Sequence, residues 1–150
     1  MSDLMKDLGY FTQKYEELSN SKELKFINFV SVDPRIKVGG VPEKPGVYII
    51  YERGKPIYVG SSGKGKANLR TRFHDLFYFN PNPKSKDPWN HTLSFKLMDS
   101  KKIGRFETID QLREFYFTKC TFKFIEMRNV REAKVLEDLM ILKLNPLYND

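Results

Sequence analysis

Two β-branched and aromatic runs, separated by a short polar turn, constrain the fold of this chain more than any other feature. The first run covers residues 46–51 and the second covers residues 56–60. The residues between them are polar and include Gly54, as a hairpin turn should, and a proline is tolerated at the start of a strand. The pattern predicts a β-hairpin with Tyr48 and Tyr58 on paired strands, where both could face one cleft.

The rest of the chain mixes helical and strand-like patterns. Apolar residues recur at helical spacing in the segments 3–18, 67–78, 108–117 and 130–144. Alternation predicts strands at 93–98 and 121–126, and residues 25–30 could form a short strand or begin another small element. Asn129 is the expected cap of the last helix, with Glu132 placed as in a capping box. The combination predicts an α+β domain, built on a small, mostly antiparallel β-sheet flanked by helices.

The length of 150 residues fits one domain with its own core, and 40% of the residues are hydrophobic. Glycines and prolines between residues 33 and 46 indicate a loop, so we place the start of the main domain near Val41. This divides the chain into an N-terminal helical and extended arm, residues 1–40, packed on a core domain, residues 41–150.

The charge of the chain favours a polyanionic partner. The sequence holds 26 basic and 19 acidic residues, a net charge of +7. From Lys55 to Lys102 there are ten basic residues and only three acidic ones, Asp75, Asp87 and Asp99. The concentration of positive charge in the middle third favours nucleic-acid binding, although a solvated lysine face would have the same composition.

Cysteine content and hydropathy indicate where the protein works. Cys120 is the only cysteine, so no disulfide can form within the chain, and a reducing intracellular setting, the cytoplasm, is expected. We interpret Cys120 as a small buried residue. No apolar run approaches the ~18 residues that would span a membrane, and the first residues do not resemble a signal peptide.

Glu137 is the residue that fits its surroundings least. With Ala133 at zero on a helical wheel, Glu137 falls at about 40°, between Leu144 at about 20° and Ile141 at about 80°. A carboxylate on this apolar face would cost several kcal/mol if it were buried without a cation. It could form an ion pair with an Arg or Lys of another element, or it could bind a hard divalent ion such as Mg²⁺.

Four motifs in order resemble those of a known family. Gly46-Val47-Tyr48 and, after nine further residues, Tyr58-Val59-Gly60 look like the paired motif that names the GIY-YIG nucleases. The segment 68–73 looks like the helix that carries the family's essential arginine. Glu137 is similarly placed to the metal-binding glutamate, and the segment 146–149 resembles the terminal Pro-x-Tyr-Asn. The resemblance covers residues 41–149.

The resemblance implies a metal-dependent endonuclease that hydrolyses DNA with Mg²⁺ or Mn²⁺ and leaves 5′-phosphate and 3′-hydroxyl ends. It implies that Glu137 holds the metal, that Tyr48 and Tyr58 activate or position the water, and that Asn149 supports the site. Arg72 is the better match to the arginine that binds the phosphate, because Leu69-x-x-Arg72-Phe73 follows the family spacing. Hydrolysis needs a deprotonated water and a stabilised leaving group.

The chain departs from the family pattern at several positions. Ser61 follows the second motif where many members have lysine, and Lys64 or Lys66 could substitute. Leu76 stands four residues after Arg72, where many members have His or Tyr. A phenol of pKa about 10 is a poor base, so we expect nearby cations to lower it, with Lys64, Lys66, Arg70 and Arg72 as candidates.

The remaining candidates concern the grip on nucleic acid. Compact members have less material between the arginine and the glutamate, so residues 79–119 resemble an insertion. Aromatic and basic residues in it, including Trp89 and His91, suit nucleic-acid contact. The residues that we expect to bind nucleic acid are Lys64, Lys66, Arg70, His74, Lys84 and Lys86.

The expected partner is double-stranded DNA, and the protein could act as a monomer or a homodimer. Two alternatives stay open at this point. The chain could be a catalytically weak or inactive nucleic-acid-binding module of the same fold, or a nuclease for RNA or branched structures. The arm of residues 1–40 could grip DNA, form a dimer contact or simply pack against the sheet.

Overall fold

The computed structural model describes residues 3–62, 67–80 and 91–149. Its centre is an antiparallel sheet with the strand order β1-β6-β4-β5. The hairpin of β4 (Gly46–Glu52) and β5 (Lys55–Ser61) confirms the strongest prediction from the sequence. β6 (Cys120–Glu126) pairs with β4 on the other side, and the short β1 (Leu24–Lys25) pairs with β6. β5 is therefore an edge strand.

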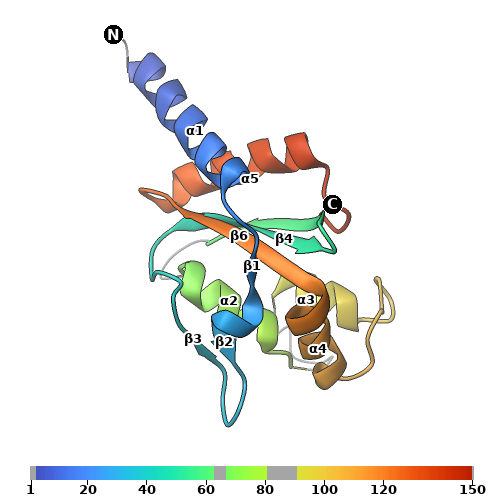
Figure 1. Ribbon diagram of the computed structural model, residues 1–150. Helices are drawn as coiled ribbons and strands as arrows, with labels where there is room; N and C mark the ends of the chain where they lie inside the picture. Colours follow the sequence, from blue (N-terminus) through green and yellow to red (C-terminus); the bar gives the residue numbers. More distant parts are fainter. Residues whose placement is uncertain (1–2, 63–66, 81–90, 150) are drawn as a thin grey trace.

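Helices cover both faces of this sheet, which confirms the α+β class (Figure 1). α1 (Asp3–Asn20) and α5 (Val130–Leu144) lie over one face, where they pack on residues such as Val47, Ile49 and Val59. α2 (Leu69–Phe77), α3 (Thr92–Met98) and α4 (Ile109–Lys119) lie over the other face. That second layer packs against Tyr48, Ile50 and Tyr58, because neighbouring strand residues point to opposite faces.

Local sequence explains where most helices begin. Asn68 caps α2 and Thr108 caps α4, each in a reciprocal capping box. Asn129 caps α5 as predicted, but the second half of the expected capping box is absent. The carboxylate of Glu132 instead pairs with the guanidinium of Arg128, at 2.7 Å.

The predicted strand at residues 93–98 is wrong, because Thr92–Met98 forms α3. Leu93 and Leu97 are buried and lie one helical turn apart, whereas Phe95 is partly exposed. In so short a run, the apolar residues fit both the two-residue repeat of a strand and the repeat of a helix. The cap at its N-terminus favours the helix. His91 supplies that cap, since its side chain accepts the backbone N–H of Leu93.

The residues before Val41 join the core. Leu24 pairs with Phe122 in the main sheet, and the 3₁₀ turn η1 (Phe26–Asn28) buries Phe26 completely. Residues 25–30 are therefore split between several short elements, which end with the small hairpin of β2 (Val30–Ser31) and β3 (Lys37–Val38). The division of the chain near residue 40 stays a prediction.

Candidate active site

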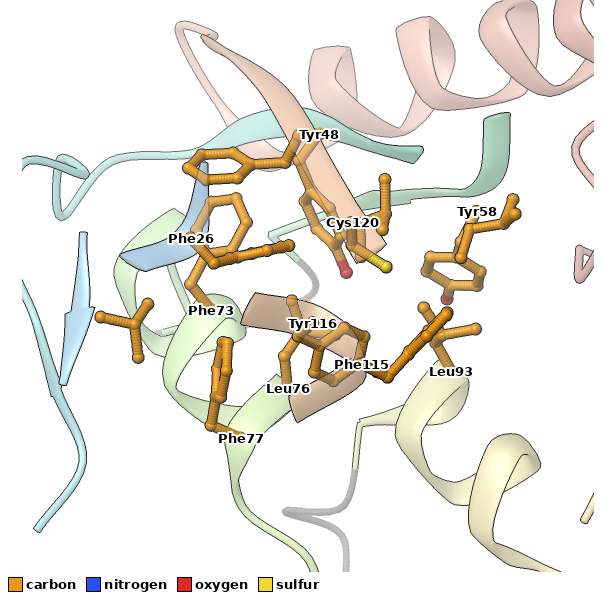
Figure 2. Packing of buried hydrophobic residues seen from close by; sticks show 14 of the residues in the cluster. Phe26, Tyr48, Tyr58, Phe73, Leu76, Phe77, Leu93, Phe115, Tyr116 and Cys120 are labelled. Atoms are coloured by element: carbon orange, nitrogen blue, oxygen red, sulfur yellow. The ribbon is translucent and has the colours of Figure 1, made fainter. Parts of the chain in front are cut away.

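Tyr48 and Tyr58 project from neighbouring strands towards the layer of α2, α3 and α4. Their ring centroids are 6.3 Å apart, and Figure 2 shows both phenol oxygens on the same side of the sheet. Tyr48 is completely buried and Tyr58 keeps 9% of its surface exposed. The deeper phenol therefore belongs to the core, and the shallower one lies closer to solvent.

The glycines of the two motifs make room for this arrangement. Gly60 faces Tyr48 across the hairpin, and a Cβ atom at Gly60 would lie 2.4 Å from the phenol oxygen. At Gly46 a Cβ atom would lie 2.3 Å from the carbonyl oxygen of Ile125 and 2.4 Å from a methyl group of Leu69. Both positions thus require the close approach that only glycine permits.

Arg72 joins the two tyrosines from α2. Its positive charge acts on the Tyr48 phenol, and its guanidinium lies 3.8 Å from the Asp75 carboxylate. The Nε atom of Arg72 is buried and has no hydrogen-bond partner among the residues that the structure describes. A buried donor without a partner costs free energy, so this N–H is suited to a ligand.

Arg70 points elsewhere, although it lies only two positions away on the same helix. Its Nε donates to the carbonyl oxygen of Val41 and its Nη1 pairs with Glu43, both at 2.8 Å. These bonds attach α2 to the loop before β4. The geometry thus separates the two arginines, with Arg72 beside the tyrosines and Arg70 in a structural contact.

His91 also reaches Tyr48, from the segment just before α3. The imidazole is fully buried, and its Nε2 atom lies 2.5 Å from the phenol oxygen of Tyr48. It packs against Tyr58 as well, with centroids 5.4 Å apart and planes at 67°. In the sequence His91 was only one of several aromatic and basic residues of the insertion. No pattern in that segment indicates contact with the first motif.

Glu137 is buried on α5, as its position on the helical wheel indicates. It is 8% exposed and lies beside the buried residues Ala133, Leu136 and Met140. Its Oε2 atom accepts a hydrogen bond from Lys134 at 2.5 Å, whereas Oε1 bonds to no described residue. The cation partner therefore comes from the same helix and is mostly exposed, so one of the two alternatives, an ion pair with another element, is not found among the described residues.

Asn149 binds the backbone of β5. Its amide group accepts the N–H of Val59 at 2.8 Å and donates to the carbonyl of Val59 at 2.9 Å. The backbone N–H of Tyr148 donates to Ile57 in the same way. The C-terminal segment thus pairs with the free edge of the strand between Tyr58 and Gly60.

Several known proteins are similar in sequence to this chain. No protein-family model matches the chain. The chain is 35% identical over 124 residues to UvrABC system protein C of Dictyoglomus thermophilum, and 31% identical over 116 residues to that of Thermotoga maritima. These matches cover 81% and 77% of this chain, which spans about 15% of the length of each relative.

One solved structure is also similar to this chain. It is described as the GIY-YIG N-terminal endonuclease domain of UvrC from Thermotoga maritima, bound to its catalytic divalent cation, magnesium. It is 28% identical to this chain, covers 74% of this chain and 89% of that chain, and has a TM-score of 0.42. This chain belongs to the GIY-YIG superfamily. The sequence likeness over most of the chain and the ordered motif residues decide the assignment.

The electrostatics of this GIY-YIG site differ from the expectation in one respect. Burial raises the pKa of Tyr48 well above its usual value, Tyr58 adds to this, and the opposing effect of Arg72 is smaller. Burial likewise raises the pKa of Tyr58, against the lowering effect of Arg72. The expectation that nearby cations lower the phenol pKa values is wrong here, because desolvation outweighs them.

The same effects place Glu137 near both motif tyrosines. Its carboxylate raises the pKa values of Tyr48 and Tyr58, although it comes from a helix on the opposite face of the sheet. β5 is the edge strand, so the side chains of both layers can approach one another around it. The charges of Arg72 and Glu137 therefore both act on the two phenols.

A single divalent ion fits the donor set of Glu137. No group of three metal-ligating side chains occurs among the described residues. Mg²⁺ is commonly held by one or two carboxylates while its other positions are filled by water and substrate phosphate. A buried carboxylate with one unbonded oxygen meets that requirement.

Only some of the other residues that we expect to bind nucleic acid are among those that the structure describes. His74 is exposed on α2, and its Nδ1 lies 3.2 Å from Asp75. Lys64, Lys66, Lys84 and Lys86 lie outside the described residues, as does Trp89. Leu76 is completely buried and apolar. Within the described parts of the chain, no helix is long and apolar enough to cross a membrane.

Proposed function

We propose that this chain is a metal-dependent endonuclease that hydrolyses phosphodiester bonds in DNA and leaves 5′-phosphate and 3′-hydroxyl ends. The observation that carries the proposal is the convergence of Arg72, two phenols and the buried carboxylate of Glu137 around the edge of one hairpin. The similarity to the Thermotoga maritima UvrC domain, an endonuclease bound to magnesium, supports the same reaction.

Arg72 binds the scissile phosphate in this proposal. Its positive charge acts on the Tyr48 phenol, while the buried Nε–H has no partner among the described residues. A fixed donor aimed at developing negative charge stabilises a transition state more than a mobile one does. The net charge of +7 adds a general attraction for the DNA backbone.

The two phenols have different roles because their burial differs. Tyr58 retains some exposure, so it is the phenol that meets the attacking water, and its ionised form, which a bound divalent ion would favour, takes the water proton. Tyr48 is sealed inside and fixes Arg72 instead. The water oxygen attacks phosphorus, the bond from phosphorus to O3′ breaks, and the leaving oxygen takes up a proton.

Glu137 would hold the divalent ion, Mg²⁺ or Mn²⁺. The bound ion supplies Lewis-acid stabilisation of the phosphate oxygens and favours the ionised form of groups near it. Lys134 occupies Oε2 in this structure and is largely exposed, so its flexible side chain can move aside at small cost. Asn149 keeps β5, and hence Tyr58, in place.

The test is cleavage of supercoiled plasmid by wild type and Glu137→Gln in Mg²⁺, Mn²⁺ or EDTA. We expect metal-dependent nicking or linearisation that falls at least about 10²-fold in Glu137→Gln, because a Lewis acid contributes several kcal/mol. Asp138→Asn is the matched control, since Asp138 is exposed on the same helix and also lies close to Lys134. DNA binding, measured by fluorescence anisotropy, should persist in both variants.

Two outcomes would contradict the proposal. Cleavage by Glu137→Gln at the wild-type rate would remove the metal-binding role of this carboxylate. Binding without cleavage of duplex DNA, single-stranded DNA, RNA or branched DNA, in any metal, would show a binding module that has the fold but no activity. Preferred cleavage of RNA or branched DNA would contradict the proposed substrate, but it would agree with the proposed hydrolysis of phosphodiester bonds.

A further inference from the structure

The imidazole of His91 is bonded through both of its nitrogens inside the core. Its Nδ1 accepts the backbone N–H of Leu93 at 3.0 Å, and its Nε2 lies 2.5 Å from the phenol oxygen of Tyr48. The ring is completely buried and packs against the rings of Tyr48 and Tyr58. An imidazole in such a place has no freedom to rotate away from its partners.

The bond to Leu93 determines which nitrogen carries the proton. A ring nitrogen that accepts an N–H must itself be unprotonated, and a neutral imidazole then carries its proton on the other nitrogen. Burial, followed by the charge of Arg72, holds the pKa of His91 well below its usual value, so the ring is neutral. The proton is therefore on Nε2, which donates to the oxygen of Tyr48.

Tyr48 thus receives a hydrogen bond from one fixed donor, His91. The positive charge of Arg72 acts on the same phenol and favours its oxygen as an acceptor. The position of the Tyr48 oxygen is set jointly by His91 and Arg72, and any movement of that oxygen changes the position of the guanidinium.

We propose that His91 is a positioning residue of the active site, which holds the Tyr48 phenol as an acceptor and through it orients Arg72 towards the phosphate. This role rests on the proposed nuclease activity. The residue comes from the segment before α3, outside the four motifs, while position 76 on α2 contributes only the buried side chain of Leu76. Tyr58 lies at the same point of the fold, because its ring packs against the His91 ring.

A purely structural role of His91, as the cap of α3, can be separated from this one by a matched pair of variants. His91→Asn keeps an oxygen that can accept the N–H of Leu93, and asparagine is a favourable N-cap. It loses the donor to Tyr48. His91→Gln can place an amide N–H where Nε2 lies, so it retains a donor to the phenol.

Single-turnover cleavage of a duplex oligonucleotide in Mg²⁺ would measure the effect. We expect the rate constant of His91→Asn to fall about 10- to 100-fold, as is common when a supporting hydrogen bond of an active site is lost. The dissociation constant for DNA should stay within about threefold, because the general charge contacts remain. His91→Gln should recover most of the lost rate. Equal rates for wild type and His91→Asn, or equal losses in both variants, would overturn the positioning role.

A second readout does not depend on activity. The chain has two histidines, so ¹⁵N ring spectra of His74→Gln show His91 alone. We expect a protonated Nε2 and an unprotonated Nδ1, with the Nε2–H resonance shifted in Tyr48→Phe. Tyr58→Phe is the control, since it keeps a ring against His91 and removes a hydroxyl that does not bond to it.

The two experiments distinguish the failure of this inference from the failure of the proposed function. Suppose that the protein cleaves DNA, but His91 carries its proton on Nδ1, or its Nε2–H resonance does not shift in Tyr48→Phe. Either result would overturn the role of His91 and leave the proposed nuclease activity intact. A wild type without cleavage in any metal would refute the nuclease and with it the catalytic consequence of this hydrogen bond, whatever the ring spectrum shows.

Discussion

Replacement of Gly60 by alanine tests how tightly the paired motif is packed. Gly60 lies opposite Tyr48 in the hairpin, and an alanine Cβ would lie 2.4 Å from the phenol oxygen, 2.5 Å from Cζ and 3.0 Å from Cε1. Ordinary contacts between such atoms are about 3.5–4 Å. The phenol or the strand must therefore move by about 1 Å.

Tyr48 has little room for such a movement. Its ring packs against Phe73 at 5.3 Å and Tyr58 at 6.3 Å between centroids, and its oxygen is bonded to His91. Excess volume in a packed core costs about 1–3 kcal/mol, and a displaced hydrogen bond adds about 1 kcal/mol. We expect Gly60→Ala to lower the free energy of unfolding by about 2–4 kcal/mol.

Urea denaturation of wild type, Gly60→Ala and Gly39→Ala would measure this loss. Gly39 is the matched control, because a Cβ there would meet nothing within 4 Å. Alanine at an unstrained glycine changes stability little, or stabilises by about 0.4–1 kcal/mol through the unfolded chain. Equal stability of the two variants would refute the inference that the last glycine of the motif is required by the phenol.

Three further predictions concern pH, an ion pair and the edge strand. Between pH 7 and pH 5 the wild type should lose up to about 2 kcal/mol that His91→Gln does not lose, because the unfolded imidazole takes up a proton below its ordinary pKa of about 6.5 and the buried one resists it. Parallel slopes of their urea stabilities against pH would contradict this. Glu52→Gln should lower the free energy of unfolding by about 1 kcal/mol at pH 7, because it breaks the paired bonds to Arg105. These bonds hold the pKa of the Glu52 carboxyl low, so their stabilising effect is lost as the carboxyl protonates. The difference between the thermal melts of variant and wild type should therefore shrink below pH about 4. Asn149→Ala should expose the backbone of Val59 and speed amide hydrogen exchange at that residue. Exchange as slow as in wild type would show that Asn149 does not protect the edge of β5.

The parts of the fold that the sequence predicts correctly are those with long, consistent patterns. β4 and β5 are confirmed because two apolar runs flank a glycine-containing turn, and α5 because fifteen residues follow one period after a capping asparagine. α3 is missed because seven residues with apolar positions at 93, 95 and 97 fit two periods. What decides it is a cap from a histidine side chain, which ordinary capping preferences do not indicate.

The candidate site divides in a similar way. Tyr48, Tyr58, Arg72 and Glu137 are recognised because each stands in a motif or on an unexpected helical face, and their roles stay predictions. Spacing on α2 favours Arg72 over Arg70, and the structure supplies the physical reason, since Arg70 is bonded to Val41 and Glu43. His91 lies 43 positions from Tyr48 along the chain, so only the fold brings the two together.

The site and the core share their side chains, which affects how variants should be interpreted. Tyr48 is among the largest fully buried residues, and β4 buries nearly every residue on both faces. Tyr48→Ala would leave a large cavity beside Phe73 and cost several kcal/mol, so lost activity would not reveal a chemical role.

Tyr48→Phe keeps the packing and removes only the oxygen that His91 and Arg72 share. Because that oxygen is buried, Tyr48→Phe leaves the Nε2–H of His91 without its acceptor and removes the polar group on which the charge of Arg72 acts. Arg72 should then lose its fixed orientation. We therefore expect Tyr48→Phe and His91→Asn to be less than additive in the double variant, because both remove the same hydrogen bond. Fully additive losses would show that the two residues act on cleavage independently.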